Sequence, residues 1–295
     1  LNPPATLDDW RRFAAADWVR RLRGVHLDGA NLSEPLRALR ETHVPTALTD
    51  VYFHRASSPG IEFMVSDLLK SRLGETVRGL HFRTGHEGLE GLIDALTHDG
   101  LRFERLSLGN MGLTAELVRQ WCERGGPLRL AELDLRDNRL GSEGMWVLPR
   151  GLAGSALRVL GLAGVDLTVD AMEALVGCEP LASLRRLDLS RNPLSPRATK
   201  LLSGAWPLAG VRALNLSRCR IGDKGVRHLT GAKFWPKLVE LDLRENPITW
   251  RAVAHLLLAP VPADLTALLL DGSEIGVDSR AALRQKFGDA VIFEG

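Results

Sequence analysis

Histidines are the first residues in this chain whose type could support chemistry. Four of the eight histidines of the 295-residue chain, His26, His54, His81 and His86, fall in one small zone of the expected surface. Imidazole binds transition metals and titrates near neutral pH, so the zone could be a metal site or a titratable binding patch. If His26 and His81 lie two parallel strands apart, about 10 Å separates them. That distance is too large for shared ligation, so we predict a polar binding patch and no metal site.

Carboxylates beside arginines form a second group. Asp134 and Asp188 could act as a general acid and a general base. Arginines alternate with them, as at Arg136 and Arg186, and a neighbouring arginine lowers the pKa of a carboxyl group. A carboxylate that stays ionised suits recognition better than proton transfer. We therefore predict that these residues contact a partner and have no catalytic role.

The cysteines offer no clear nucleophile. Cys122, Cys178 and Cys219 are odd in number and scattered, which argues against a disulfide framework and for a reducing compartment. We expect all three to be buried, because free cysteine is usually a packing residue. The sequence has no glycine-rich phosphate loop, nucleophile elbow, HExxH motif or paired CxxC motif. We predict that the chain is not an enzyme, has no catalytic residue and binds no cofactor.

A repeat must position these residues. The frame L-x-x-L-x-L-x-x-N-x-L recurs at one constant step, without insertion, from Phe103 to Leu265, and three weaker copies precede this series at irregular spacings. The ten copies begin at Leu22, Leu48, Val77, Phe103, Leu130, Leu157, Leu184, Val211, Leu238 and Leu265. An unbroken series of this kind is typical of a solenoid.

The pattern within each copy predicts a strand followed by a helix. The L-x-L alternation indicates a short strand with one buried face. Asn138, Asn192 and Asn246 fill the ninth frame position, where an amide can satisfy backbone groups as the chain turns. Further along, small residues and leucines recur four positions apart, which is typical of one buried helix face. We predict an α/β solenoid with a concave parallel sheet and convex helices.

The solenoid needs caps at both ends. Residues 1–21 carry Trp10, Phe13 and Trp18 at near-helical spacing and indicate an N-terminal capping helix. The repeats are expected to span residues 22–275, and residues 276–295 are expected to form a C-terminal cap of one helix and an edge strand at 291–293. An eleventh frame would begin at Ile292, which lies one full repeat length after Leu265.

The copies LAELDLRDNRL, LRRLDLSRNPL and LVELDLRENPI resemble the leucine-rich-repeat superfamily, in its long ribonuclease-inhibitor-like form. The ending LRQKFGDAV, with Ala16-Asp17-Trp18 near the start, is similar to bacterial leucine-rich-repeat proteins that carry a repeat-companion domain. The superfamily resemblance implies a horseshoe solenoid that recognises proteins through its concave face. It does not name a partner, because a fold does not determine a function.

Frame positions 3, 5, 7, 8 and 10 should face the concave side. Charge along this face runs from basic and histidine-rich, through mixed, to acidic, and such polarity can orient a partner. We predict that the partner contacts residues in these columns: Tyr52, His54, Arg83, Asp134, Arg136, Arg186, Asp188, Arg218, Asp242 and Arg244. On the convex side, the neighbouring pairs Trp206-Pro207 and Trp235-Pro236 leave a second, aromatic contact site as an alternative.

Composition places the chain among ordinary globular proteins. Its formal net charge is +2, and it has neither an apolar run of membrane-spanning length nor an apolar signal-peptide centre. We predict a cytoplasmic, non-enzymatic adaptor or scaffold that binds a protein, with no nucleic-acid or membrane partner. The first residue is Leu1 and not Met, which keeps an alternative open: a substrate-recognition or sensor domain of a larger multidomain enzyme whose catalytic part lies outside this chain.

Overall fold

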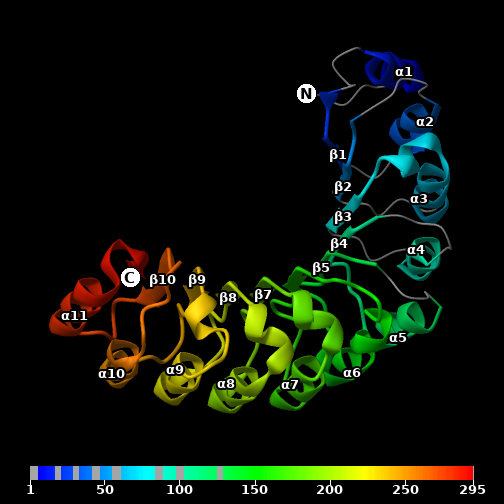
Figure 1. The fold of residues 1–295 in the computed structure, drawn as a ribbon. Helices are drawn as coiled ribbons and strands as arrows, with labels where there is room; N and C mark the ends of the chain where they lie inside the picture. Colours follow the sequence, from blue (N-terminus) through cyan, green and yellow to red (C-terminus); the bar gives the residue numbers. More distant parts are fainter. Residues whose placement is uncertain are drawn as a thin grey trace.

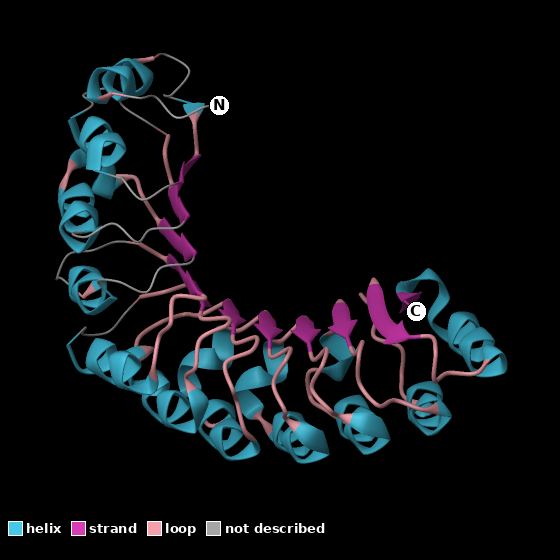
Figure 2. Cartoon of the chain, turned by 180° about the vertical axis from the view of Figure 1, so that it is seen from behind, coloured by secondary structure: helices cyan, strands magenta, loops and turns pink. Residues whose placement is uncertain are grey.

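The computed structural model describes residues 6–16, 21–28, 33–41, 47–54, 61–83, 89–97, 103–124 and 129–294. Within these ranges, eleven parallel strands form one open sheet in the order of the sequence. The strands line the inside of an L-shaped solenoid and the helices line the outside (Figures 1 and 2). The predicted α/β solenoid with a concave sheet is therefore confirmed.

The strands are short, and their pairing follows the sequence frame. They are β1 (Gly24–Asp28), β2 (Asp50–His54), β3 (Gly79–Arg83), β4 (Arg105–Gly109), β5 (Glu132–Asp134), β6 (Val159–Gly161), β7 (Arg186–Asp188), β8 (Ala213–Asn215), β9 (Glu240–Asp242), β10 (Ala267–Asp271) and β11 (Val291–Glu294). Gly24 pairs with Asp50, Asp50 with Gly79, and Gly79 with Arg105, which reproduces the irregular first steps. From β4 to β10 each pairing advances by the constant step of the sequence frame.

The last step differs from the expectation. Val291 pairs with Leu268, which holds frame position 4, so the step into β11 is shorter than the sequence frame predicts. The prediction that a new frame begins at Ile292 is therefore wrong. The cause is the connection: α11 leads directly through a single 3-10 turn, Gly288–Ala290, into the strand.

The helices occupy the second half of each repeat. They are α1 (Leu7–Ala15), α2 (Ser33–Glu41), α3 (Ile61–Lys70), α4 (Leu89–Leu96), α5 (Ala115–Arg124), α6 (Gly141–Gly151), α7 (Val169–Val176), α8 (Ser195–Gly204), α9 (Gly222–Thr230), α10 (Trp250–Leu258) and α11 (Val277–Phe287). Their column of small residues is buried, as at Ala198, and so is the leucine column, as at Leu202. A small residue lets each helix approach the strand layer while the leucine fills the core.

Buried asparagines tie consecutive repeats together. The side chain of Asn192 accepts hydrogen bonds from two backbone N–H groups of the preceding repeat and donates to three carbonyl groups, at 2.7–3.2 Å. Asn138 and Asn246 make the same five contacts. In the repeat between Asn192 and Asn246, the Cys219 thiol donates to the Leu189 carbonyl at 3.1 Å. From Asn138 to Asn246, an asparagine therefore makes these contacts in every second repeat, and we call this series the asparagine ladder.

A residue in the left-handed conformation follows each of the regular strands from β4 to β9. Frame position 8 has a φ between 54° and 62° in six consecutive repeats, at Asn110, Asp137, Gly164, Arg191, Arg218 and Glu245. This turn carries the chain from the sheet toward the helix. The charged members of the series therefore project from the edge of the concave face and not from its floor.

Candidate functional site on the concave face

Aromatic rings form an ordered column on the N-terminal arm. His26 on β1, Tyr52 on β2 and His81 on β3 occupy frame position 5 and lie side by side in the strand register. Neighbouring ring centroids are 4.3 Å apart, and the ring planes differ by 5° and 11°. The spacing follows from strands about 4.8 Å apart, so the zone predicted as a polar patch is a stacked ladder.

Two histidines of this zone meet directly. Nδ1 of His26 lies 3.0 Å from Nε2 of His54, within hydrogen-bond distance. The ring centroids are 5.3 Å apart and the planes differ by 16°, so the two rings are stacked. In this contact one ring nitrogen donates its N–H to the lone pair of the other, so the two histidines are bound to each other. Sequence reasoning weighed only His26 against His81 and missed this diagonal contact; His86, the fourth histidine of the zone, lies outside the described residues.

An ion pair spans three strands next to the ladder. Nε and Nη2 of Arg105 on β4 donate to the two carboxylate oxygens of Asp50 on β2, at 3.1 and 3.0 Å. His81 on β3 contacts the same carboxylate at 3.1 Å. Burial alone would raise the pKa of Asp50, but hydrogen bonds from Thr49, His81 and Arg105 outweigh burial and lower it. The carboxylate is therefore a fixed anion that orients the Arg105 guanidinium and the His81 imidazole.

Sequence reasoning did not select Asp50 or Arg105. Both occupy frame position 3, and the residue between them in the register is Gly79. A Cβ at Gly79 would overlap the Asp50 carboxylate, so only glycine leaves room for the pair. The sequence does contain a signal for this contact: at frame position 3, opposite charges stand two repeats apart and a glycine holds the same position in the repeat between them.

A hollow lies at the inside of the bend between the two arms. It encloses about 250 Å³ and is lined by Tyr52, His81, Arg83, Arg105, Leu106, Ser107, Glu132, Leu133, Asp134, Arg136 and Val159. Ser107 is a small residue in the middle of the position-5 row, between His81 and Asp134. Four of the predicted contact residues, Tyr52, Arg83, Asp134 and Arg136, therefore meet around one depression.

The aspartates of the central and C-terminal strands have a structural role. Oδ1 of Asp134, Asp188 and Asp242 each accepts a hydrogen bond from the backbone N–H two residues later, at 3.0–3.1 Å. This contact closes the turn at the end of the strand, as aspartate commonly does. The carboxylate of Asp242 is nearly buried, with 12% of its side chain exposed. These residues hold the face in shape whether or not they touch a partner.

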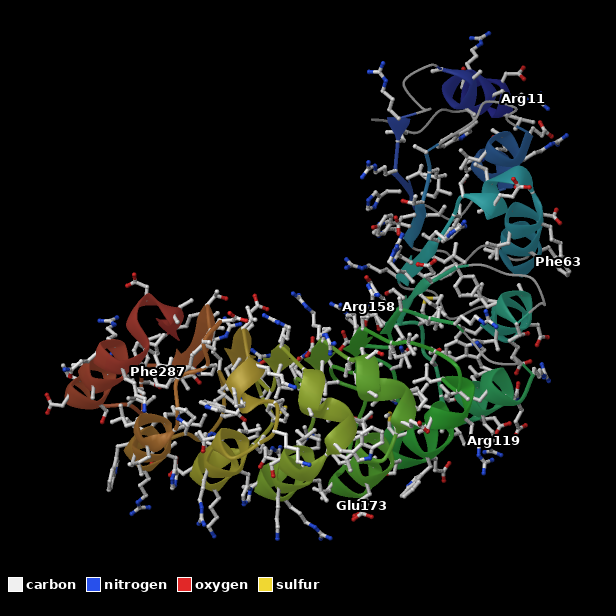
Figure 3. All side chains as sticks on the ribbon, viewed as in Figure 1. Arg11, Phe63, Arg119, Arg158, Glu173 and Phe287 are labelled. Carbon is white, nitrogen blue, oxygen red and sulfur yellow. The ribbon has the colours of Figure 1, made fainter. Side chains whose placement is uncertain are left out.

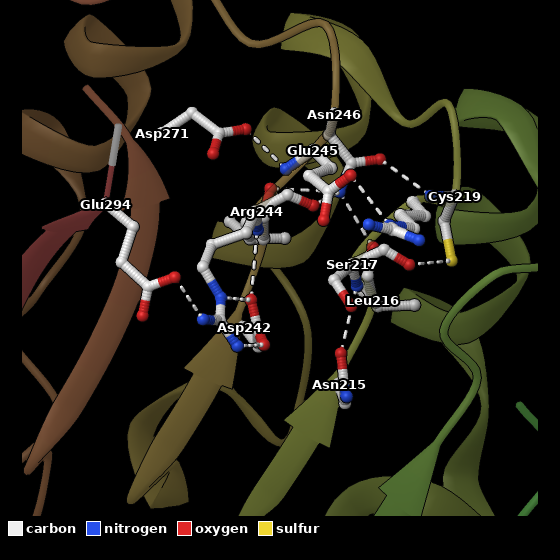
Figure 4. Close-up of polar contacts among 12 residues, drawn as sticks. Asn215, Leu216, Ser217, Cys219, Asp242, Arg244, Glu245, Asn246, Asp271 and Glu294 are labelled. Atoms are coloured by element: carbon white, nitrogen blue, oxygen red, sulfur yellow. Dashed lines mark hydrogen bonds and ion pairs between the residues drawn. The ribbon is translucent and has the colours of Figure 1, made fainter. Parts of the chain in front are cut away.

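Arginines on the same face are held by neighbouring acids. Arg136 pairs with Asp134 at 2.7 Å, Arg191 with Asp137 at 2.7 Å, and Arg218 with Glu245 at 2.7 Å. Figure 4 shows Arg244 between Asp242 and Glu294. Hydrogen bonds to these carboxylates raise the pKa of Arg136, Arg218 and Arg244.

One arginine of the predicted set is held more loosely. Arg186 lies 3.8 Å from Glu240, and 63% of its side chain is exposed. It occupies the C-terminal arm with Asp188, Arg218, Asp242 and Arg244, away from the hollow. The structure therefore divides nine of the predicted contact residues into two groups, four around the hollow and five along the C-terminal arm, while His54 lies outside both groups and contacts His26.

The cysteines are unsuited to nucleophilic catalysis. Burial raises the pKa of Cys219 to about 12 and that of Cys122 and Cys178 to about 11. A thiol with such a pKa carries almost no thiolate at neutral pH. Among the described residues, no group of three or more histidine, cysteine, aspartate or glutamate side chains is arranged to hold a metal ion. Within the same ranges, none of the helices has the length and apolar character needed to cross a bilayer.

The paired tryptophans on the convex side do not form a common surface. Trp206 is exposed, but Trp235 is buried and its indole N–H donates to the Pro260 carbonyl at 2.8 Å. The prediction of a joint Trp206 and Trp235 contact site is therefore wrong. Trp235 packs into the core because the 3-10 turn that carries it, Trp235–Lys237, faces the strand layer.

Comparisons with known proteins identified one family model and similar solved structures. A family model described as a leucine-rich repeat matches residues 130–146 and 211–229. The chain is similar to a chain in the crystal structure of the Rad7 and Elc1 complex in yeast, with a TM-score of 0.72 and 17% identity over 98% of this chain and 73% of that chain. It is also similar to a chain of the TLR13–ssRNA13 complex, with a TM-score of 0.45 and 18% identity over 83% of this chain and 35% of that chain. No curated protein matches the sequence.

Proposed function

We propose that this chain, which has the fold of a leucine-rich-repeat solenoid, is a non-enzymatic module that binds a protein partner on its concave face. The observation that carries the proposal is the hollow around Ser107, which takes side chains from five successive strands, β2 to β6. A volume of about 250 Å³ admits one or two side chains of a partner. We infer that a protruding loop or helix end of the partner enters the bend and places an anchor residue there.

The surroundings of the hollow favour a preorganised site. Asp50 holds Arg105 and His81 in place, while Asp134 holds Arg136 and accepts a hydrogen bond from the Ser107 hydroxyl at 3.3 Å. Side chains that are already ordered lose little conformational entropy when a partner binds. Arginine and tyrosine at such a site also supply the planar, amphipathic contacts that are enriched in protein interfaces.

The pairing of charges on this face favours protein over nucleic acid. A phosphate backbone is bound through arginines and lysines that are available to it, but most arginines described on the concave sheet already contact a carboxylate. The three cysteines are free thiols, as expected for a reducing compartment. We therefore propose a cytoplasmic adaptor or scaffold.

Filling the hollow tests the proposal. Ser107→Trp places an indole in the depression without changing charge, and we expect it to weaken capture of the partner from the native lysate by about tenfold or more, which corresponds to about 1.4 kcal/mol. Gln120→Trp, on the outer side of α5, is the matched control and should capture normally. Equal capture by Ser107→Trp, with the protein folded, would show that the partner does not use the hollow.

A further inference from the structure

The outer faces of α8, α9 and α10 carry a concentration of positive charge that the concave proposal does not use. Five exposed cations lie on these three neighbouring helices: Arg197, Lys200, Lys224, Arg227 and Arg251. The whole chain is nearly balanced, with 38 lysines and arginines against 36 aspartates and glutamates, so this local excess is not a result of composition. We call these five residues the basic strip.

Corresponding positions in the flanking repeats are acidic. Arg197, Lys224 and Arg251 are each one repeat apart and lie in the first turn of their helices, where α7 has Asp170 and α11 has Asp278. One helical turn later, Lys200 and Arg227 correspond to Glu173 of α7, which projects outward from the convex side (Figure 3). The basic strip is therefore three repeats wide and has a carboxylate at each end.

The charges of the basic strip are not neutralised within the protein. No ion pair in the described part of the chain involves any of its five side chains. The acid within these helices, Asp223 on α9, accepts hydrogen bonds from the Thr249 N–H and hydroxyl at 2.7 and 2.8 Å. The arginines of the concave sheet, by contrast, mostly contact carboxylates. Unpaired cations on adjacent helices repel one another, so a bound anion would relieve a real electrostatic cost.

We propose that the basic strip is a docking surface for an acidic segment of a partner polypeptide. Adjacent packed helices are about 10 Å apart, so the first-turn cations of α8, α9 and α10 form a row with that spacing. A segment in the polyproline II conformation rises about 3.1 Å per residue with three residues per turn, so acidic side chains at every third residue lie on one face about 9 Å apart and match the row. The segment lies across the helices and covers all three of them.

An aromatic side chain sits at one end of the strip. Trp250 is 63% exposed, and the guanidinium carbon of Arg251 lies 5.4 Å from the centroid of its ring. A tryptophan held by an arginine gives a partner an apolar anchor next to the charged row, as in the centres of many protein interfaces.

The shape of the charge pattern favours a polypeptide over an anionic membrane. Helices α7 to α10 form a shallow arc along the outside of the C-terminal arm (Figure 1). A lipid surface in contact with α8 to α10 would also approach Asp170 and Glu173 of α7, whose charges it would repel. A short acidic segment can end before those carboxylates. This inference does not depend on the concave site, because the basic strip and the hollow lie on opposite sides of the solenoid.

Fluorescence anisotropy with a defined probe tests the proposal on the full chain. The probe is a labelled peptide with glutamate at every third residue, and the reference is the same peptide with glutamine in place of glutamate. We expect saturable binding of the glutamate peptide that weakens steeply with added salt and at least tenfold weaker binding of the glutamine peptide. Lys200→Glu with Arg227→Glu should weaken binding of the glutamate peptide at least tenfold.

A charge-matched control separates the strip from net charge. Lys70→Glu with Arg150→Glu changes two exposed cations on α3 and α6 by the same amount and should leave peptide binding unchanged. Equal losses in both double variants would overturn the proposal, because net charge alone would then explain binding. Binding of phosphatidylserine vesicles or of an RNA oligonucleotide through the same two residues, without binding of the peptide, would overturn it as well. Ser107→Trp should have no effect in this assay.

Discussion

Asp50 and Arg105 form a two-point ion pair although β3 lies between their strands. Nε and Nη2 of the guanidinium lie 3.1 and 3.0 Å from the two carboxylate oxygens. The pair closes across Gly79, the residue of β3 that has no side chain to separate them. This contact joins the first repeats to the wall of the hollow, so it couples the stability of the N-terminal arm to the shape of the proposed site.

Adding one methyl group between the two charges tests this coupling. Gly79→Ala places a Cβ where the Asp50 carboxylate lies, so the pair must open or the strands must shift. We expect a loss of about 1–3 kcal/mol in the free energy of unfolding, measured by denaturant titration. Gly24→Ala, at the same frame position on β1, is the control, since its Cβ would meet Tyr52 at an ordinary 3.4 Å. Equal effects of the two variants would argue against a special role for the gap.

The Asp50 carboxylate also makes the free energy of unfolding depend on pH. Because the folded-state pKa of Asp50 is lowered, its contribution is fully present above the ordinary aspartate pKa of about 3.9 and is lost as the pH falls through the folded value. Asp50→Asn should therefore unfold more easily than the wild type at pH 7, and the difference should shrink below about pH 4. Denaturation midpoints at several pH values measure this. A difference that stays constant down to pH 2 would contradict the assignment.

The asparagine ladder predicts a graded series. Asn192→Ala removes five hydrogen bonds and leaves buried backbone groups without partners, so we expect a loss of at least about 3 kcal/mol. Asn192→Cys should lose less, because Cys219 serves the equivalent position with a thiol that donates to a carbonyl group. We expect urea titration to give a free energy of unfolding that falls in the order wild type, Asn192→Cys, Asn192→Ala. If Asn192→Ala were as stable as Asn192→Cys, these hydrogen bonds would not be the interaction that holds the repeats together.

The cysteines should react only slowly with alkylating reagents until the protein unfolds. With folded pKa values of about 11 for Cys122 and Cys178 and about 12 for Cys219, almost no thiolate exists at pH 8. Iodoacetamide should therefore label the native protein far more slowly than the same protein in denaturant, where the pKa returns to about 8.5. Rapid labelling of Cys219 in the native state, located by mass spectrometry, would show that the turn around it is open.

Local sequence patterns account for most of the fold. The leucine frame predicted the register of every strand pair up to β10, because a parallel ladder in a solenoid advances by one repeat at each step. It failed at Val291, because a periodic frame carries no information about a connection shortened at the end of the series. The burial of Trp235 was missed for a similar reason, since its direction is decided by a 3-10 turn and not by the frame.

The candidate site could be predicted less well. Frame positions identify which residues face the concave side, but not which side chains meet. The contact between His26 and His54 runs diagonally between two strands, and Arg105 reaches Asp50 only because Gly79 intervenes. Such contacts depend on side-chain length and on gaps two repeats away. The hollow itself depends on the small Ser107 in a row of larger neighbours, which no single repeat reveals.

Photo-crosslinking from single positions tests the central claim most directly. We would place benzoylphenylalanine at Tyr52 or Arg83, which line the hollow, and at Phe63 or Arg119, which project from α3 and α5 on the convex side (Figure 3). A partner bound on the concave face should crosslink at Tyr52 and Arg83 and not at Phe63 or Arg119, and Ser107→Trp should suppress the crosslink. Crosslinks confined to the convex positions, or concave crosslinks that persist in Ser107→Trp, would contradict binding in the hollow.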